Sequence, residues 1–167
     1  GPLYAPGESN SMQVIRGLHN LTPAQQGCAA TIGNFDGVHL GHQAVLGQLA
    51  ERAGDLGLPT TVIIFEPQPQ EYFAPGQAPP RLTRLREKLA ALRRFSVDRV
   101  LCIRFDRAFA ELTADEFVQR VLIDGLGVRY LAVGADFRFG QARTAAFDFL
   151  PRAAEREGSQ VAPPHSL

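Results

Sequence analysis

The sequence has no tryptophan, one methionine and two cysteines among its 167 residues. Cys28 and Cys102 lie far apart in apolar runs, which argues against a disulfide framework and against a zinc site. An excess of either charge is also missing, because 17 basic residues balance 17 acidic ones. No global field therefore draws the chain to nucleic acid or to a membrane surface, and any anionic ligand must be held by local groups.

Long hydrophobic runs are absent as well. No uncharged apolar stretch reaches the about 18 residues that suggest a membrane-spanning helix, and the amino terminus lacks the basic and then apolar layout of a secretion signal. We therefore expect a cytoplasmic protein with no membrane partner and no nucleic-acid partner. Residues 1–11, which carry several Gly, Pro and Ser residues, have the character of a cloning remnant, and we expect one domain over residues 12–167.

Short apolar runs alternate with longer amphipathic ones from Cys28 onward. The apolar runs predict strands at residues 28–35, 60–67, 98–105, 128–134 and 159–164. The amphipathic runs predict helices at residues 42–57, at 82–95, from Thr113 and within 145–157, and the Pro- and Gly-rich residues 67–80 predict a loop. This alternation indicates an α/β fold, a Rossmann-like parallel sheet with helices on both faces.

Three of these helices carry more specific signals. The first has an apolar face, with Gly54 and Gly57 as stop signals, made of Val45, Leu46, Leu49, Ala53 and Leu56. The second sets four leucines on one side and six charged residues on a solvated face. Thr113 and Glu116 form a capping box at the start of the third, and we give them no further role.

Ligands of parallel sheets bind beyond the carboxyl ends of the strands. The four segments that follow those ends are GNFDGVHLGH (33–42), EPQPQEYF (66–73), FDRAFAEL (105–112) and GADFRFGQAR (134–143). We expect these four loops to converge at one end of the sheet.

The first loop has the composition of an anion site. Its glycines allow a sharp turn with open amide N–H groups, and Gly41 and His42 fall where a helix begins, so a positive dipole end faces the ligand. His39 and His42 can then point at the same anion. No serine or cysteine lies beside them, which favours electrostatic stabilisation of phosphate over covalent catalysis. The Rossmann and Walker glycine patterns are both missing, so this is another kind of phosphate-binding turn.

These segments together resemble the adenylyltransferase domain of bacterial bifunctional FAD synthetases, in the His-x-Gly-His nucleotidyltransferase superfamily. The resemblance runs from about Met12 to the end of the chain and rests on GNFDGVHLGH, VIIFEPQPQEYF, RLT and LAVGADFRFGQAR. It implies the nucleotidyltransferase fold and transfer of AMP from ATP to FMN, giving FAD and pyrophosphate. It also implies Mg²⁺, held mainly through phosphates, and a riboflavin kinase domain in the parent chain.

The resemblance also implies roles for individual residues. The catalytic contacts to the ATP phosphates fall to His39, His42 and Asn34, next to Gly33 and Gly41. Phe35 and Asp36 would line the adenine side, and Glu66 would stand at the FMN phosphate or metal end. The flavin pocket and its polar contacts would be formed by Pro67, Asp136, Phe137, Arg138, Phe139 and Arg143.

Three departures from the family pattern bear on activity. Gln68 stands where the pattern has histidine, and Ala145 where it has glycine. A Ser-Ser-Thr-x-x-Arg segment and the kinase domain of the family do not occur in this sequence. We therefore expect no kinase activity and weakened adenylyl transfer from this chain.

Simpler interpretations stay open for several of these residues. A histidine near a helix start is often a cap or a surface group, and Glu66 is equally suited to capping a neighbouring backbone. Phe137 and Phe139 would serve as core anchors, and Arg138 and Arg143 as solvated charges. For the whole chain, the alternatives are a flavin- and nucleotide-binding module with little turnover, or a related nucleotidyltransferase with another phosphorylated acceptor such as phosphopantetheine or glycerol phosphate.

Overall fold

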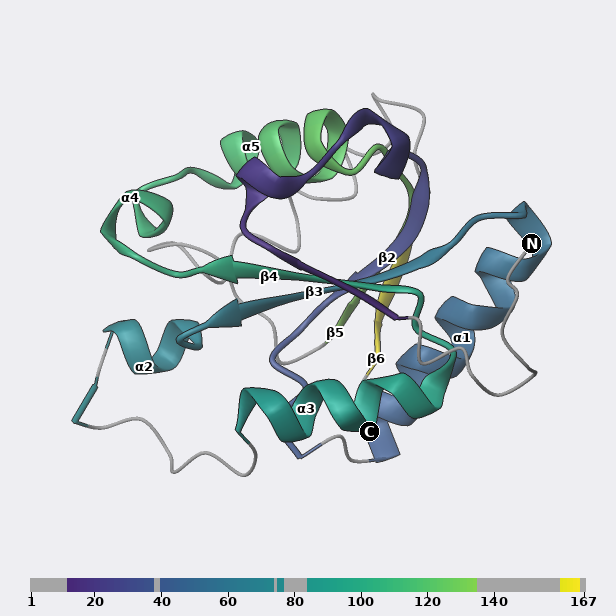
Figure 1. Ribbon diagram of the computed structural model, residues 1–167, viewed down its shortest axis with the longest axis horizontal. Coiled ribbons are helices and arrows are strands. Elements are labelled where there is room, and N and C mark those ends of the chain that lie inside the picture. The colour runs from purple at the N-terminus through teal and green to yellow at the C-terminus, as the bar shows by residue number, and fades with distance from the viewer. Residues whose placement is uncertain (1–11, 38–39, 74, 77–83, 135–159, 166–167) are drawn as a thin grey trace.

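The computed structural model describes residues 12–37, 40–73, 75–76, 84–134 and 160–165 (Figure 1). Its centre is a six-stranded sheet in which every neighbouring pair is parallel, in the order β1-β4-β3-β2-β5-β6. The strands are β1 (Gln13–Arg16), β2 (Cys28–Ile32), β3 (Thr60–Glu66), β4 (Arg99–Arg104), β5 (Val128–Gly134) and β6 (Gln160–His165). The α/β fold with a parallel sheet is therefore confirmed.

Two strands differ from the expected pattern. β1 is an additional strand at the side of the sheet, and its four residues are too few to give a periodic signal. β2 ends at Ile32 rather than at residue 35, because Phe35 adopts a left-handed backbone with φ of 52°. That conformation is incompatible with a strand.

Helices cover both faces of the sheet, as Figure 1 shows. One face packs against α1 (Leu40–Leu56), α3 (Leu85–Leu92) and the 3₁₀ turn η4 (Arg93–Phe95). The other packs against α4 (Arg107–Ala110), α5 (Ala114–Phe117), its π-helical continuation η5 (Val118–Gly125) and the connection that contains η2 (Leu18–Asn20) and η3 (Pro23–Gln25). The predicted helix within residues 145–157 lies outside the described residues.

Alternating side chains of the strands build the two cores. In β3, Ile63 and Phe65 enter the core under α5 and η5, whereas Val62 and Ile64 enter the core under α1 and α3. All four are at most 1% exposed, so each contributes about 1.5–3 kcal/mol of transfer free energy to folding. A strand that is apolar on both faces is typical of a parallel sheet covered on both sides.

The apolar face of α1 is confirmed for four of its five predicted residues. Val45, Leu46, Leu49 and Ala53 are buried, but Leu56 is 36% exposed. Leu56 is the last residue of α1, and Gly57 follows with φ of 68°, so the chain turns away from the core there.

The charged face of α3 is only partly solvated. Arg84, Arg86 and Glu87 are exposed as expected, but Lys88, the single lysine of the sequence, is fully buried. Lys88 lies three residues after Leu85 and four before Leu92, so its stem shares the buried stripe of the helix. The assignment of Lys88 to a solvated face was therefore wrong.

The predicted loop at residues 67–80 contains a short helix, α2 (Pro69–Phe73). Proline at its first position lacks only an N–H that would be unpaired there, so the proline-rich composition conceals the helix. Tyr72 and Phe73 pack edge-on against Phe105, with ring centroids 5.5 and 5.7 Å apart. These contacts fix α2 against the loop that follows β4.

The structure agrees with the prediction that the two cysteines do not form a disulfide. Cys28 and Cys102 are buried, are not joined in a disulfide, and belong to the cores on opposite faces of the sheet. Burial raises the pKa of the Cys28 thiol above its usual range.

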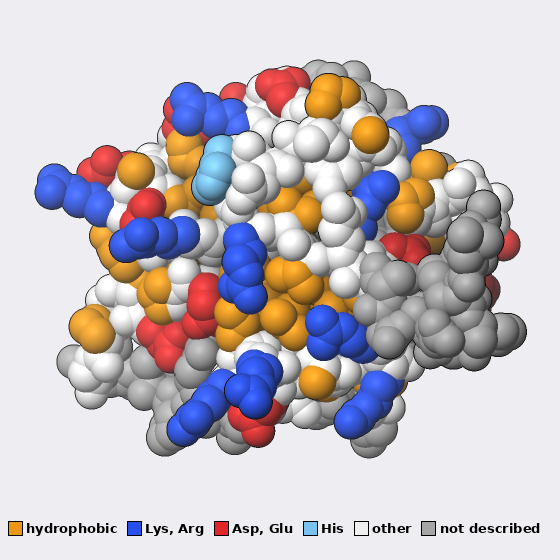
Figure 2. All heavy atoms as spheres, viewed as in Figure 1, with side chains coloured by type: hydrophobic (Ala, Val, Ile, Leu, Met, Phe, Trp, Pro, Cys, Tyr) orange, Lys and Arg blue, Asp and Glu red, His pale blue; other side chains and the backbone are white. Residues whose placement is uncertain are grey.

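On the face shown in Figure 2, Lys and Arg side chains are spread singly or in small groups, with acidic side chains among them. Because Lys88 is buried, the exposed basic side chains of the described residues are arginines. In the part of the chain that the structure describes, no helix has the length and apolar character needed to cross a membrane.

Candidate functional site

The strands β2, β3, β4 and β5 all end on the same side of the sheet, which we call the carboxyl end. Ile32 of β2 pairs with Ile63 of β3 and with Val133 of β5, and Glu66 of β3 pairs with Arg104 of β4. The loops that follow β2, β3 and β4 therefore start side by side, as expected. The loop that follows β5 lies outside the described residues.

A sharp turn begins directly after β2. The backbone N–H of Gly33 donates to the carbonyl of Ile63 at 3.2 Å, which continues the sheet by one residue. A Cβ atom at Gly33 would lie 2.9 Å from the ring of Phe35, so a side chain there would displace the ring. Phe35 and Gly37 both have positive φ, at 52° and 78°. The turn thus depends on glycine at positions 33 and 37.

This turn delivers the chain to the first turn of α1, where Gly41 and His42 are found. His42 is 8% exposed, and its ring packs on that of Phe35 with centroids 4.8 Å apart and planes tilted by 43°. Phe35 is itself only 2% exposed and belongs to the core under α1 and α3. The ring of Phe35 therefore restricts the orientation of the His42 imidazole.

Asn34 lies between Gly33 and Phe35 in the same turn. Its side-chain oxygen Oδ1 is buried and accepts no hydrogen bond from any described residue. Buried polar atoms are nearly always paired in native proteins, so an unpaired one calls for a partner such as a ligand or a water. An amide oxygen is an acceptor, so its partner must carry a donor or be a cation.

The neighbouring strand β3 ends at Glu66, which is half-buried. The Glu66 carbonyl accepts a hydrogen bond from Phe105 N–H at 3.2 Å, and the Glu66–Pro67 peptide bond is cis. Pro67 is exposed beside it. Both residues thus lie at the carboxyl end, on the strand next to β2, which the turn with Asn34 follows.

Gln68 is the second residue after β3 and is 5% exposed. Its backbone is fully engaged, because its N–H donates to Glu71 Oε1 at 2.8 Å and its carbonyl accepts from Tyr72 N–H at 3.1 Å. Its side-chain nitrogen Nε2 is buried and has no hydrogen-bond acceptor among the described residues. The sequence drew attention to Gln68 only as a departure from a family pattern and did not include it in the site.

The structure brings together Gly33, Asn34, Phe35, Asp36, Gly41, His42, Glu66 and Pro67 at the carboxyl end of β2 and β3. The remaining predicted site residues lie outside the described residues: His39, Asp136, Phe137, Arg138, Phe139 and Arg143. Among the residues that the structure does describe, no three His, Cys, Asp or Glu side chains gather in a metal-binding group.

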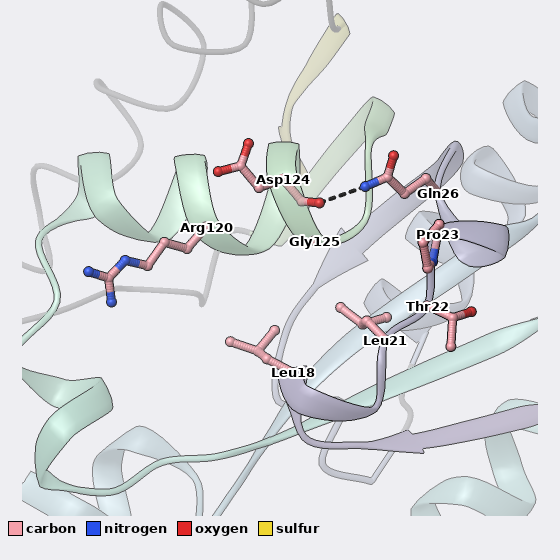
Figure 3. A pocket seen from close by; sticks show the side chains of 8 residues that line it. All are labelled: Leu18, Leu21, Thr22, Pro23, Gln26, Arg120, Asp124 and Gly125. Atoms are coloured by element: carbon pink, nitrogen blue, oxygen red, sulfur yellow. Dashed lines mark hydrogen bonds between the residues drawn. The ribbon is translucent and has the colours of Figure 1, made fainter.

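A separate cavity of about 270 Å³ lies between η5 and the connection from β1 to β2 (Figure 3). Two of its lining residues, Gln26 and Gly125, shortly precede the amino ends of β2 and β5. Gln26 Nε2 donates to the carbonyl of Asp124 at 2.7 Å, and the Arg120 side chain extends away from the cavity. None of the predicted site residues lines it.

The chain matches the protein-family model for FAD synthetase over residues 21–166. It belongs to the FAD synthetase family. The match includes all four of the loops that were expected to converge at the carboxyl end.

Among proteins similar to this FAD synthetase family member are three bifunctional riboflavin kinase/FMN adenylyltransferases. Those of Pseudomonas fluorescens and Escherichia coli K12 are 55% and 54% identical to it, each covering 90% of this chain and 48% of the relative. That of Buchnera aphidicola from Acyrthosiphon pisum is 38% identical over 84% of this chain and 45% of the relative. The chain thus spans about half the length of these curated relatives.

A solved structure also shares the fold of this family member. The crystal structure of a macrolide-efflux protein from Streptococcus pneumoniae superposes with a TM-score of 0.74 at 23% identity, covering 92% of this chain and 51% of that chain. At that level of identity the likeness concerns the fold alone.

Proposed function

We propose that this chain is an FMN adenylyltransferase, which transfers AMP from ATP to the phosphate of FMN and releases FAD and pyrophosphate. The observation that carries the proposal is 55% identity to a bifunctional riboflavin kinase/FMN adenylyltransferase over 90% of this chain. That alignment is long enough to include the turn after β2 and the segment after β3.

The nucleotide takes the crevice at which the strand order reverses. From β2 the chain passes to β3 and β4 on one side of the sheet and then crosses to β5 on the other side of β2. Parallel sheets bind nucleotides at such a switch point, beyond the strand ends. The open backbone of Gly33 and Gly41 and the first turn of α1 then meet the ATP phosphates, with His39, His42 and Asn34 as side-chain contacts. Phe35 and Asp36 are assigned to the adenine side.

The chemistry needs positioning more than a base. A phosphate oxygen of FMN forms a new P–O bond to the α-phosphorus of ATP, and the bond from that phosphorus to the bridging oxygen breaks, so the electron pair leaves with pyrophosphate. The attacking oxygen is already anionic, so no side chain has to remove a proton. Imidazoles aimed at the phosphates stabilise the charge that develops during transfer.

Mg²⁺ is expected to accompany ATP and to neutralise phosphate charge. It prefers oxygen ligands and retains waters, which fits a described site that offers the carboxylate of Glu66 and the amide oxygen of Asn34 but no three-residue metal cluster. Glu66 and Pro67 are assigned to the FMN end, together with Asp136, Phe137, Arg138, Phe139 and Arg143 of the loop after β5. We place the protein in the cytoplasm, in a parent chain that also carries a riboflavin kinase domain.

The test is a discontinuous assay of this chain with ATP, FMN and MgCl₂, with FAD and pyrophosphate quantified separately. The proposal predicts FAD and pyrophosphate in equal amounts. Binding of both substrates without any FAD would instead support a binding module. Pyrophosphate release with phosphopantetheine or glycerol phosphate, but not with FMN, would identify a nucleotidyltransferase with another acceptor.

A further inference from the structure

We propose that the ring of Phe35 is a positioning group for His42, which holds the imidazole in the orientation that phosphate binding requires. The inference rests on the proposed function, in which His42 contacts the ATP phosphates. It changes the role of Phe35, which the proposed function assigns to the adenine side. That assignment then concerns the backbone of Phe35 and not its ring.

The ring of Phe35 faces the core rather than the space beyond the strands. Only 2% of the residue is exposed, and it shares the core under α1 and α3 with Val62 of β3 and Leu92 of α3. An adenine base that stacks on an aromatic side chain needs one open face of its ring. A ring buried to this extent has no open face, so its contacts lie within the protein.

One contact of the Phe35 ring connects the core to the candidate site. Its centroid lies 4.8 Å from that of the His42 imidazole, with the planes tilted by 43°. His42 is 8% exposed and precedes the buried Val45 and Leu46 by three and four residues, so it occupies the start of the buried stripe of α1. The imidazole therefore lies at the edge of the core beside Phe35 instead of extending into solvent.

The backbone of Phe35 has a conformation that bulky side chains rarely adopt. Its φ of 52° lies in the left-handed region, where steric crowding disfavours residues other than glycine and asparagine. Residues held in such conformations cluster at functional sites and persist only where the surrounding structure compensates for the strain. Glycine would form the same turn with less strain, so the turn alone does not explain an aromatic residue at this position.

Gly33 leaves the space in which the Phe35 ring lies. A Cβ atom at Gly33 would lie 2.9 Å from Cε2 and 3.2 Å from Cδ2 of that ring. A side chain at position 33 would therefore displace the ring, and the ring would no longer support the imidazole of His42. Gly33, Phe35 and His42 thus form one packed row from the end of β2 to the first turn of α1.

The packed row orients the imidazole before the substrate arrives. Groups that stabilise developing charge act best when they are preorganised, and packing of their neighbours supplies this preorganisation. Without the ring, His42 would sample other rotamers and would have to be ordered during the reaction. Loss of the ring should therefore slow adenylyl transfer while recognition of the adenine base stays intact.

The first test compares Phe35→Leu, which keeps an apolar side chain but removes the flat ring, with the control Leu92→Val on the α3 side of the same core. Steady-state kinetics of FAD synthesis, measured well below each unfolding midpoint, gives kcat and KM for ATP and for GTP. We expect Phe35→Leu to lower kcat about tenfold, with KM for ATP and the ratio of kcat/KM for ATP and GTP unchanged. Leu92→Val should lower the unfolding midpoint and leave kcat unchanged.

A double-mutant cycle with Gly33→Ala separates the ring from the backbone of the turn. If the added Cβ acts by displacing the ring, Gly33→Ala should lower kcat about tenfold in the parent chain and clearly less in Phe35→Leu, where no ring is left to displace. Equal losses in both backgrounds would mean that the methyl group obstructs the phosphates directly, and would overturn the packed row.

NMR of the ligand-free chain tests the contact without any activity. We expect nuclear Overhauser effects between the ring protons of Phe35 and His42, and a shift of the His42 resonances in Phe35→Leu while those of the exposed His19 stay in place. Unchanged His42 resonances would overturn the proposal. A raised KM for ATP with a lost preference over GTP and an unchanged kcat would overturn it too, because that result identifies an adenine contact. A parent chain that makes no FAD would refute the proposed function, whereas the resonances still decide whether Phe35 positions His42.

Discussion

At the amino end of the sheet, Thr60 and Asp98 pair with each other, whereas at the carboxyl end Asn34 and Gln68 hold buried polar atoms that pair with nothing described. Thr60 N–H donates to Asp98 Oδ2 at 2.8 Å, and Asp98 N–H donates back to Thr60 Oγ1 at 2.8 Å. Gln26 and the carbonyl of Asp124 are paired in the same region. These amino-end pairs thus satisfy each other within the chain, whereas the amides of Asn34 and Gln68 each keep one buried atom without a described partner.

This difference shows how one sheet can be stable and still bind a ligand. Internal hydrogen bonds at the amino end close the core beneath the strands, and their loss would leave buried donors without acceptors. Unpaired groups at the carboxyl end reduce stability slightly but are ready for a ligand without rearrangement. Mutations at the two ends should therefore act on different observables.

The largest effect is expected at His42. Replacing His42 by alanine removes the imidazole that the ring of Phe35 orients, and we expect FAD turnover to fall about 10²-fold, the typical loss of one donor to developing charge. His39→Ala should behave alike. Steady-state kinetics, measured well below the unfolding midpoint of each variant, checks this. Near-normal FAD synthesis by either variant would contradict the assignment of the anion site.

At the amino end, Asp98→Ala should act on stability alone. It leaves the N–H of Thr60, which is 4% exposed, without its acceptor, at an expected cost of about 2 kcal/mol in free energy of unfolding. Asp98→Asn keeps an acceptor oxygen and should cost less. Urea unfolding measures the free energy, and unchanged kcat and KM are expected in both variants. A loss of activity in the folded Asp98→Ala protein would break the division between the two ends.

Asn34→Ala is the converse change at the carboxyl end. Asn34 Oδ1 accepts no hydrogen bond from the described residues, so the loss of this oxygen breaks no hydrogen bond among them. We expect kcat/KM for ATP to fall about tenfold, equivalent to about 1.4 kcal/mol, with the free energy of unfolding unchanged. A variant that unfolds more easily but keeps its kcat/KM would show that Asn34 serves the fold instead.

Thr113 tests whether a polar residue after β4 affects activity when its hydrogen bonds are already satisfied within the chain. It caps α5 near the loop that follows β4, and its Oγ1 accepts from Glu116 N–H at 3.1 Å, while its own N–H donates to Glu116 Oε1 at 2.9 Å. Because these groups satisfy each other, Thr113→Ala should cost about 1 kcal/mol of stability and leave FAD synthesis unchanged. Impaired turnover at full occupancy of the folded state would mean that the cap takes part in the site.

The smallest effect concerns acid pH. The backbone N–H of Thr113 lowers the pKa of the exposed Glu116 carboxyl below its usual range. A lowered native pKa stabilises the fold above the unfolded-state pKa, and this contribution is lost as the pH falls through the native pKa. Unfolding midpoints measured from neutral to acid pH should therefore decline slightly less in Glu116→Gln than in the parent chain. Parallel declines would argue against the contribution.

The sequence predicts those features of the structure that arise from local patterns of residues, but not those that arise from tertiary packing. Runs such as residues 60–66 and 128–134 identify their strands because an apolar, β-branched run has few alternatives, and the capping box of Thr113 marks a helix start through local bonds alone. The parallel arrangement follows from the alternation of the elements. That arrangement is enough to predict that the loops after β2, β3 and β4 start at the same end of the sheet.

The features that the sequence does not predict arise from packing. Prolines around α2 conceal a helix that rings on Phe105 hold in place, and Lys88 is buried because its neighbours on α3 are leucines. No sequence pattern reveals the unpaired amide atoms of Asn34 and Gln68, because the lack of a partner depends on which groups surround them in the folded protein. The family resemblance supplied Asn34 and drew attention to Gln68 as a departure from its pattern, but that both amides hold a buried, unpaired atom is seen only in the folded protein.

The most direct test of the account follows the side-chain amides by NMR in the ¹⁵N-labelled chain during titration with FMN and with ATP plus Mg²⁺. We predict that the resonances of Asn34 shift with ATP, while those of Gln26, whose Nε2 is already paired with the carbonyl of Asp124 at 2.7 Å, stay in place. Movement of Gln26 as large as that of Asn34, or no movement of Asn34 when ATP is bound, would contradict the assignment of ligand binding to the carboxyl end of the sheet.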